Sequence, residues 1–265
     1  MDNSLLTAVL GALIGLALAL TGAGGGILAM PLLMLGLHLT VVQAAPIALL
    51  AVGISAALGG AIALRENRLR YRAAGLIGVV GICTAPLGAW IAHRIPTAPM
   101  TVLFALVLTY VAIRMMRDAR VSSQIPPDQK LPCVIDPDQG RLHWTAPCAR
   151  ALMMTGGLSG VLSGALGVGG GFVIVPSLAR YTNLDQASVV GTSLGVIALV
   201  SAGSVAVAVG AGSMLWPVAV PFALGSLAGM IVGSRLAGLL SVVALKRSFG
   251  AISLVAAAVI VIRIV

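Results

Sequence analysis

The chain has 265 residues, of which 59% are hydrophobic and 9% are charged, and its mean hydropathy is +1.10. These values lie far outside the range of soluble domains and predict an all-α polytopic membrane protein. The net charge of +9 would suit a nucleic-acid partner, but Lys and Arg of membrane proteins collect in cytoplasmic loops. We therefore expect a lipid bilayer and no nucleic acid.

The first apolar segment is broken by glycines. The N-terminal "MDNS" carries Asp2 and no Lys or Arg, so we do not expect a signal peptide. "LTGAGGGILAMP", residues 20–31, places four glycines between apolar stretches at 5–20 and 27–39, and a proline inside the second stretch. Together these stretches are too long for one perpendicular span and short for two, because a crossing takes about 20 residues. We expect a short hairpin with the glycines at its tip, inside the membrane.

Further apolar segments of about the length of a membrane span follow along the chain. They cover roughly residues 43–64, 73–93, 99–116, 148–166, 186–209, 214–238 and 244–264. The segment at 148–166 leads into a second glycine motif, "GVGGGFVIVP". The order of segments in the second half therefore repeats the order in the first.

The two halves align without a gap. "GAGGGILAMP" and "GVGGGFVIVP" lie 145 residues apart, and the same offset pairs Gly15 with Gly160, Leu49 with Leu194, Tyr71 with Trp216, Gly88 with Gly233 and Phe104 with Phe249. A register held over about a hundred residues indicates two homologous repeats. We expect repeats at 1–116 and 148–265, joined by a polar, proline-containing linker at 117–147.

Each repeat is predicted to contain a glycine-broken short hairpin plus three transmembrane helices. If each repeat crosses the membrane an odd number of times, the second repeat has the opposite orientation in the membrane from the first. With the N-terminus outside, this arrangement puts most Lys and Arg in the cytoplasm, including those of the 65–72 loop and the linker. A single broken span in place of the hairpin leaves more cations outside, so the positive-inside rule favours inverted repeats with a cytoplasmic linker.

The cysteines do not indicate a bridged or metal-binding protein. Cys83, Cys133 and Cys148 are odd in number and show no CxxC spacing, so we expect neither a disulfide framework nor a zinc site. Cys133, His143 and Cys148 share the polar loop, but three unevenly spaced ligands without a fourth do not meet the usual requirements. We expect no metal and no cofactor.

The glycine breaks are candidates for an anion site. Non-helical backbone at membrane depth must be satisfied by protein or by a watery cavity. A helix that starts at about Ile27 or Phe172 offers free N–H groups and the positive end of its dipole, which suit an oxyanion. Glycines also allow close helix packing, but their repetition at identical spacing favours a site. We predict that substrate is bound by Gly24, Gly25, Gly26, Gly169, Gly170 and Gly171 and that Pro31 and Pro176 break the helices.

These motifs resemble a known family. "GAGGGILAMPLL" and "GVGGGFVIVPSL", each followed by a small-residue segment ("QAAPIALLAV" and "SVVGTSLGVI"), are similar to the duplicated signature of the sulfite exporter TauE/SafE family. The resemblance implies a multi-pass permease of the bacterial inner membrane that moves sulfite, organosulfonates or related small anions. "GTSL" at 191–194 matches the family's usual pattern, whereas "APIAL" at 45–49 departs from it and puts a hydroxyl contact there in doubt.

Several side chains are candidates for contacting the anion. All seven acidic residues lie in tails, loops or segment ends, which disfavours coupling through a buried carboxylate. A negative interior drives an anion outward, so we predict a uniport-like, voltage-assisted exporter. Arg235 is the charge inside an apolar segment, with snorkelling to the interface as its alternative role. Polar contacts are predicted from Thr21, Gln43, Thr192 and Ser193, with Ser201 as a further donor, although such hydroxyls often bond to their own helix.

Other functions remain as alternatives. The direction of transport stays open, so an uptake permease for a sulfur-containing or other small anion is the first of them. "GLSG" at 157–160 would fit an intramembrane serine protease, but the base it needs is missing, since His38, His93 and His143 are not central in any span. A non-transporting scaffold has no use for two glycine breaks. A homodimer stays open as the assembly.

Overall fold

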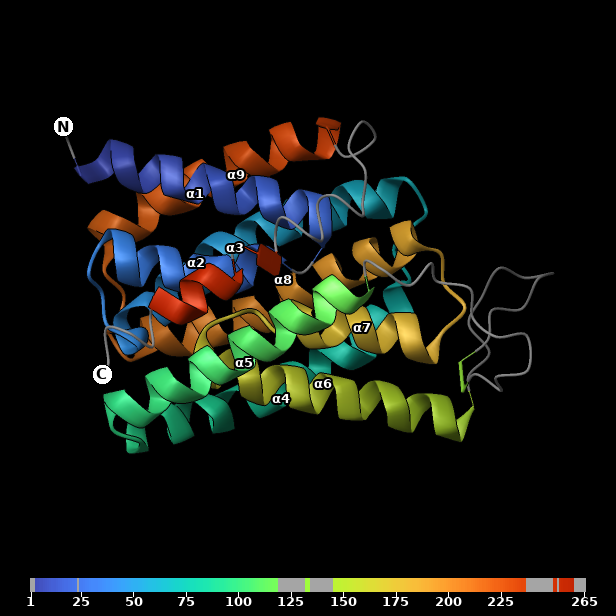
Figure 1. The fold of residues 1–265 in the computed structure, drawn as a ribbon. Coiled ribbons are helices and arrows are strands. Elements are labelled where there is room, and N and C mark those ends of the chain that lie inside the picture. Colours follow the sequence, from blue (N-terminus) through green and yellow to red (C-terminus); the bar gives the residue numbers. More distant parts are fainter. Residues whose placement is uncertain are drawn as a thin grey trace.

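The chain folds into a bundle of helices (Figure 1). The computed structural model describes residues 3–22, 24–118, 132–133, 145–236, 250–251 and 253–259. Within these residues the named helices are α1 (Asn3–Thr21), α2 (Gly24–Gly36), α3 (Val41–Arg65), α4 (Tyr71–Arg94), α5 (Thr97–Asp118), α6 (Ala146–Leu166), α7 (Gly171–Tyr181), α8 (Gln186–Gly210) and α9 (Trp216–Leu236).

The helices have the length and composition of membrane spans. Ser4–Thr21, Val41–Arg65, Tyr71–Ala92, Gln186–Gly210 and Trp216–Leu236 are long and apolar enough to cross a bilayer, and Gly25–Gly36 and Pro99–Ile113 are shorter apolar helices. The outside of the bundle exposes large apolar side chains such as Leu106, Tyr110 and Met154, as expected for a surface that faces lipid. The predicted all-α membrane fold is confirmed; the segment at 244–264 lies mostly outside the described residues.

Both glycine motifs sit where a long helix gives way to a short one. α1 ends before Gly22, whose φ of +69° lies in the left-handed region that favours glycine. α2 then runs back along α1, because Gly25 packs on Leu18 and Gly36 lies against Leu10. In the second motif Gly167, Gly169 and Gly170 all have positive φ, and Gly170 packs against Ser159 of α6. Each motif therefore forms the turn of a helical hairpin.

The two prolines lie inside helices, which corrects their predicted role. Pro31 is within α2 and Pro176 is within α7, and both helices continue past them. A proline removes one backbone N–H and disturbs the carbonyl four residues earlier. Both prolines stand near the middle of their short helices, beyond the first four residues whose N–H groups lack partners, so each removes one intrahelical bond without ending the helix. The breaks are made by the glycines instead.

The loops gather at two opposite ends of the bundle. At one end the backbone N–H of Arg70, before α4, donates to Thr192 Oγ1 near the start of α8, and Cys133 N–H donates to Tyr181 O at the end of α7. We call this the linker end. At the opposite end, the start of α3, the start of α5 and the loop after α8 surround one cavity. Figure 1 shows α1 starting at this second end and α6 at the linker end.

Glycines line the closest helix pairs, which are α1 with α9 and α4 with α6. Gly11 and Gly15 of α1 lie against the backbone at Phe222 and Ser226 of α9. The α4–α6 pair is built in the same way, with Gly156, Gly160 and Gly164 against the α4 backbone. Small residues at intervals of four let helix backbones approach closely in a membrane. Each of these pairs joins a helix from the first half of the sequence to one from the second half.

A disulfide joins Cys133 to Cys148, so the expectation of unpaired cysteines was wrong. Both cysteines are wholly buried, and Cys133 forms a backbone bridge with Thr182 that holds the linker against the end of α7. The odd cysteine count was misleading because Cys83 is a separate, exposed thiol on α4. Among the described residues no cluster of three metal-ligating side chains occurs; His143 lies outside them.

Asp185 caps the start of α8, and replacing it with alanine is expected to lower the free energy of unfolding by about 1 kcal/mol. Its Oδ2 accepts from Ser188 N–H at 3.3 Å, and hydrogen bonding with Ser188 lowers the pKa of this carboxyl below its ordinary 3.8. A lowered folded-state pKa means that the stabilisation is present above the ordinary pKa and is lost as the pH falls through the folded value.

Thermal unfolding in detergent at several pH values tests this prediction. Asp185→Asn is the matched control, because asparagine caps helices as well as aspartate but does not titrate. We expect the asparagine variant to match the wild type at neutral pH and to lack the loss of stability in acid. Equal destabilisation of the alanine and asparagine variants at neutral pH would contradict the capping role.

Candidate functional site

The two glycine breaks meet inside the bundle. Gly26, in the first turn of α2, lies directly against the backbone carbonyl of Val168 in the second break. Each break is also seated on a helix from the other half of the sequence, because Gly22 packs on Val190 of α8 and Gly167 packs on Ala45 of α3. The helix starts of α2 and α7 are thus brought to one region between α3 and α8.

The polar side chains around the first break form hydrogen bonds with backbone groups of the protein. Ser193 Oγ donates to Gly22 O at 2.9 Å and to Val190 O at 2.8 Å. Thr21 Oγ1 donates to Ala17 O of its own helix, and Thr192 Oγ1 accepts from Arg70 N–H at the linker end. Because these bonds satisfy backbone groups at a helix end and in a loop, Ser193 and Thr192 have structural roles here.

Near the second break, two serine hydroxyls have no hydrogen-bond partner. Ser201 of α8 is wholly buried, and its Oγ has no hydrogen-bond partner. This oxygen lies 3.6 Å from the position that a Cβ on Gly169 would take. On the other side of the break, Ser159 Oγ approaches Gly170 O at 3.5 Å, and Ser163 is wholly buried with an unpartnered Oγ. Ser159 and Ser163 lie one turn apart on the same face of α6.

Two predicted site residues lie away from the breaks. Gln43 is exposed in the first turn of α3, where its side-chain oxygen accepts from Thr40 N–H at 3.2 Å and caps the helix. Arg235 is exposed in the last turn of α9, which agrees with the snorkelling alternative. The two breaks therefore come together, with Thr21 before the first break and Ser193 bonded to it, while Thr192 lies at the linker end and Gln43 and Arg235 lie away from the breaks.

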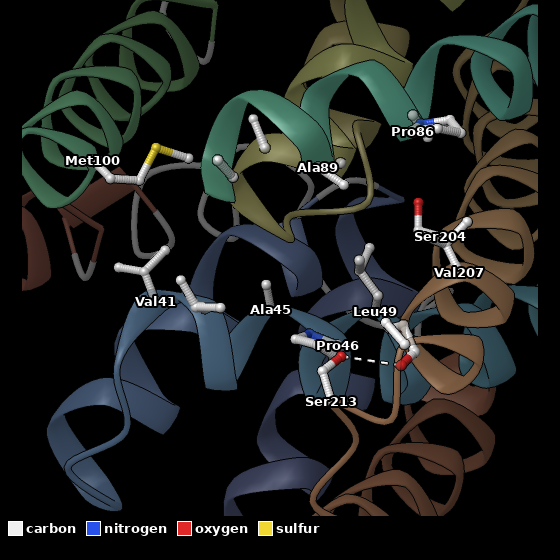
Figure 2. A pocket seen from close by; sticks show the side chains of 17 residues that line it. Val41, Ala45, Pro46, Leu49, Pro86, Ala89, Met100, Ser204, Val207 and Ser213 are labelled. Atoms are coloured by element: carbon white, nitrogen blue, oxygen red, sulfur yellow. Dashed lines mark hydrogen bonds between the residues drawn. The ribbon is translucent and has the colours of Figure 1, made fainter. Parts of the chain in front are cut away.

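An apolar cavity of about 80 Å³ approaches the second break from the end opposite the linker. Figure 2 shows Val41, Ala45, Pro46 and Leu49 of α3 facing Pro86 and Ala89 of α4, with Ser204 and Val207 of α8 at one side. Gly164 and Ala165, next to Ser163, also line it. Its lining carries no charged residue. The polar side chains of the wall are Ser204, which donates to Val200 O, and Ser213, which donates to Ala208 O.

Charge lies at the ends of the bundle rather than in its middle. Among the described residues, Glu66 pairs with Arg68 in the exposed loop after α3, and Arg94 lies over the Trp90 ring at the end of α4. The described carboxylates of Glu66 and Asp185 lie in a loop and before a helix start, and Asp118 is the last residue of α5. The interior of the described bundle can therefore offer an anion hydroxyls, backbone N–H groups and helix dipoles, but no ion pair.

Sequence reasoning identified Ser201 as one donor among several and missed Ser163. A signal for both is present in the repeat comparison, because the positions 145 residues earlier are Ala56 and Leu18. A serine that replaces an aliphatic residue in one copy of a buried motif calls for a polar partner. Reading the repeats for their differences would have found these hydroxyls.

Comparisons with known proteins agree with one another. The family model for the sulfite exporter TauE/SafE matches residues 7–260. A "Probable membrane transporter protein" of Xylella fastidiosa (strain Temecula1 / ATCC 700964) is 30% identical over 261 residues, covering 96% of this chain and 93% of its own. A second protein with this name, from Xylella fastidiosa (strain 9a5c), is 32% identical over 234 residues, covering 86% and 82% of the two chains. No solved structure matches the chain.

Proposed function

The chain belongs to the sulfite exporter TauE/SafE family of membrane transporters, and we propose that it exports a small sulfur-containing anion, sulfite or an organosulfonate, across the bacterial inner membrane. The observation that carries the proposal is the meeting of two glycine-initiated helix starts, α2 and α7, where Gly26 lies against Val168. Unpaired N–H groups and the positive ends of two helix dipoles then converge on one region, which favours an anion.

The repeat and the orientation are part of this proposal. Gly22 contacts Val190, and Gly167 contacts Ala45. The two contacts are equivalent, because Gly167 lies 145 positions after Gly22 and Val190 lies 145 positions after Ala45. Such exchanged contacts support two inverted repeats at 1–116 and 148–265. The described arginines of the linker end, Arg65, Arg68, Arg70, Arg72, Arg150 and Arg180, support a cytoplasmic linker by the positive-inside rule.

We propose uniport driven by the membrane potential. A carboxylate is the usual relay for protons in transporters, and the described helices contain none away from their ends. The potential itself drives one negative charge outward with about 2.3 kcal/mol per 100 mV. At about 1.4 kcal/mol per factor of ten, this sustains a gradient of about fiftyfold per 100 mV.

Flux into and out of proteoliposomes tests the function. Vesicles containing the purified protein are loaded with sulfite, sulfate, thiosulfate, sulfoacetate or taurine, and a potassium gradient with valinomycin sets the voltage. We expect flux of at least one of these anions that rises with a negative interior and does not depend on a proton gradient at fixed voltage. No flux of any of them, or strict proton dependence at fixed voltage, would contradict the proposal.

A further inference from the structure

The two breaks differ in the side chains that surround them. Three positions that the 145-residue offset relates are aliphatic beside the first break and serine beside the second: Ile14 and Ser159, Leu18 and Ser163, Ala56 and Ser201. All six side chains are wholly buried. A buried hydroxyl without a partner costs free energy, whereas an aliphatic side chain of similar size does not. The second break therefore carries a polarity that packing alone does not explain.

Two of the three serine hydroxyls at the second break, those of Ser163 and Ser201, have no hydrogen-bond partner. Neither Ser163 Oγ nor Ser201 Oγ has a hydrogen-bond partner, although serines in helices commonly donate to the carbonyl of the preceding turn. Around the first break the comparable hydroxyl, Ser193 Oγ, is bonded to Gly22 O and Val190 O. Buried hydroxyls are satisfied at the first break and unpartnered at the second, so the second break is where hydrogen-bond donors are available to a bound ligand.

Backbone donors lie beside these hydroxyls. The first turn of α7 follows Gly170. Val173 N–H and Ile174 N–H donate to Gly170 O, and the N–H groups of Gly171 and Phe172 come before them, with no earlier turn of helix to donate to. Gly169 has φ +71° and no side chain, and a Cβ there would lie 3.6 Å from Ser201 Oγ, beside Val52 and Ile197. Hydroxyls of α6 and α8 thus flank the start of α7 on two sides.

We propose, on the basis of the transport function above, that the anion binds at the second break alone, held by Ser163 Oγ, Ser201 Oγ and the N–H groups that begin α7, and that it is a singly charged oxyanion. The charge follows from the donors, since hydroxyls and two helix dipoles of about half a unit charge each can balance one negative charge far better than two. Bisulfite and alkanesulfonates belong to this class, whereas sulfate is a dianion.

The cavity gives this site an approach path. Its wall includes Gly164, next to Ser163, and Ser204, one helical turn beyond Ser201. The wall is apolar and uncharged, which raises the free energy of a dianion much more than that of a monoanion. The cavity stops short of the buried Ser201 side chain, so the site lies behind its inner end and is closed to solvent in this conformation.

Ligand binding to the purified protein tests the proposal, with methanesulfonate and sulfate as probes at equal ionic strength. We expect wild-type protein to bind methanesulfonate at least about tenfold more tightly than sulfate. Ser163→Ala/Ser201→Ala should raise the Kd for methanesulfonate by about tenfold or more, the effect of losing hydrogen bonds to a charged group. Its Tm without ligand should equal or exceed that of the wild type, because two unpartnered buried hydroxyls are removed.

Ser55→Ala is the matched control. Ser55 is as deeply buried, but its Oγ is bonded to Ser226 Oγ at 2.7 Å away from the break, so its Kd should not change. Wild-type Kd in the Ser163→Ala/Ser201→Ala protein, or equal affinity for sulfate and methanesulfonate, would overturn the proposal. If the wild type moves an anion and the double variant moves it equally well, only this site assignment fails. If the wild type neither binds nor moves any anion, the proposed function fails with it.

Discussion

Replacing Gly15 by leucine is expected to abolish the folded bundle. A Cβ at this position would collide with the backbone carbonyl of Ser226 and lie 2.8 Å from Met230 N, so α1 and α9 would have to separate. Overpacking a tight interface costs about 1–3 kcal/mol, and more where backbone is the obstacle. We expect the purified variant to lose its monodisperse peak in size-exclusion chromatography and its cooperative thermal transition.

Gly75→Leu is the control for this substitution. Gly75 lies in α4, and a Cβ there would meet nothing within 4 Å, so the same change in composition and helix propensity is made without a collision. The Gly75 variant should elute and unfold like the wild type. A Gly15→Leu protein as stable as Gly75→Leu would show that the α1–α9 contact is not as close as described.

Loss of the Cys133–Cys148 disulfide is expected to have the second largest effect. The bond closes a loop of 15 residues, for which chain entropy predicts about 3 kcal/mol of stabilisation. Reduction of the purified protein, or Cys133→Ser/Cys148→Ser, should lower Tm by several degrees, measured in detergent with and without reductant. Cys83→Ser is the control, because Cys83 is unpaired and exposed. A Tm that does not respond to reductant would contradict this role.

The same cysteines test the proposed orientation in living cells. Disulfides persist in oxidising compartments and are rare in the cytosol, so a cytoplasmic linker predicts free thiols in growing cells and a bond after purification in air. Cells are quenched in acid, denatured and alkylated with a maleimide that adds mass to each thiol. Three modified cysteines per chain are expected. One modified cysteine would place the linker end outside and reverse the proposed orientation.

Much of the fold follows from the sequence because a bilayer leaves an apolar chain few ways to satisfy its backbone hydrogen bonds. Apolar runs of span length must be helical in a bilayer, and the predicted segments at 43–64 and 186–209 correspond to α3 and α8. The hairpin turns were also predictable, since positive φ at Gly22 and Gly167 is a conformation that glycine adopts at little cost.

Other features could not be read from the sequence, because they depend on which helices become neighbours. The disulfide forms because the start of α6 and the linker are both held at the end of α7, and spacing rules carry no such information. Gln43 was predicted to contact the anion, but in the structure it caps a helix, as Asp185 does. Ser193 and Ser201 are both buried serines of α8, yet Ser193 Oγ donates to Gly22 O of the first break and Ser201 Oγ has no partner.

The pairing of α1 with α9 also affects how the protein is made. Nearly two hundred residues separate the end of α1 from the start of α9, so at roughly 5–20 residues per second the ribosome needs roughly 10–40 seconds to supply the partner. During this time the glycine-lined face of α1 has no matching backbone to pack against. Closure of the bundle is therefore a late event that follows synthesis of most of the chain, and until then α1 remains in the membrane packed on α2 but with its glycine-lined face uncovered.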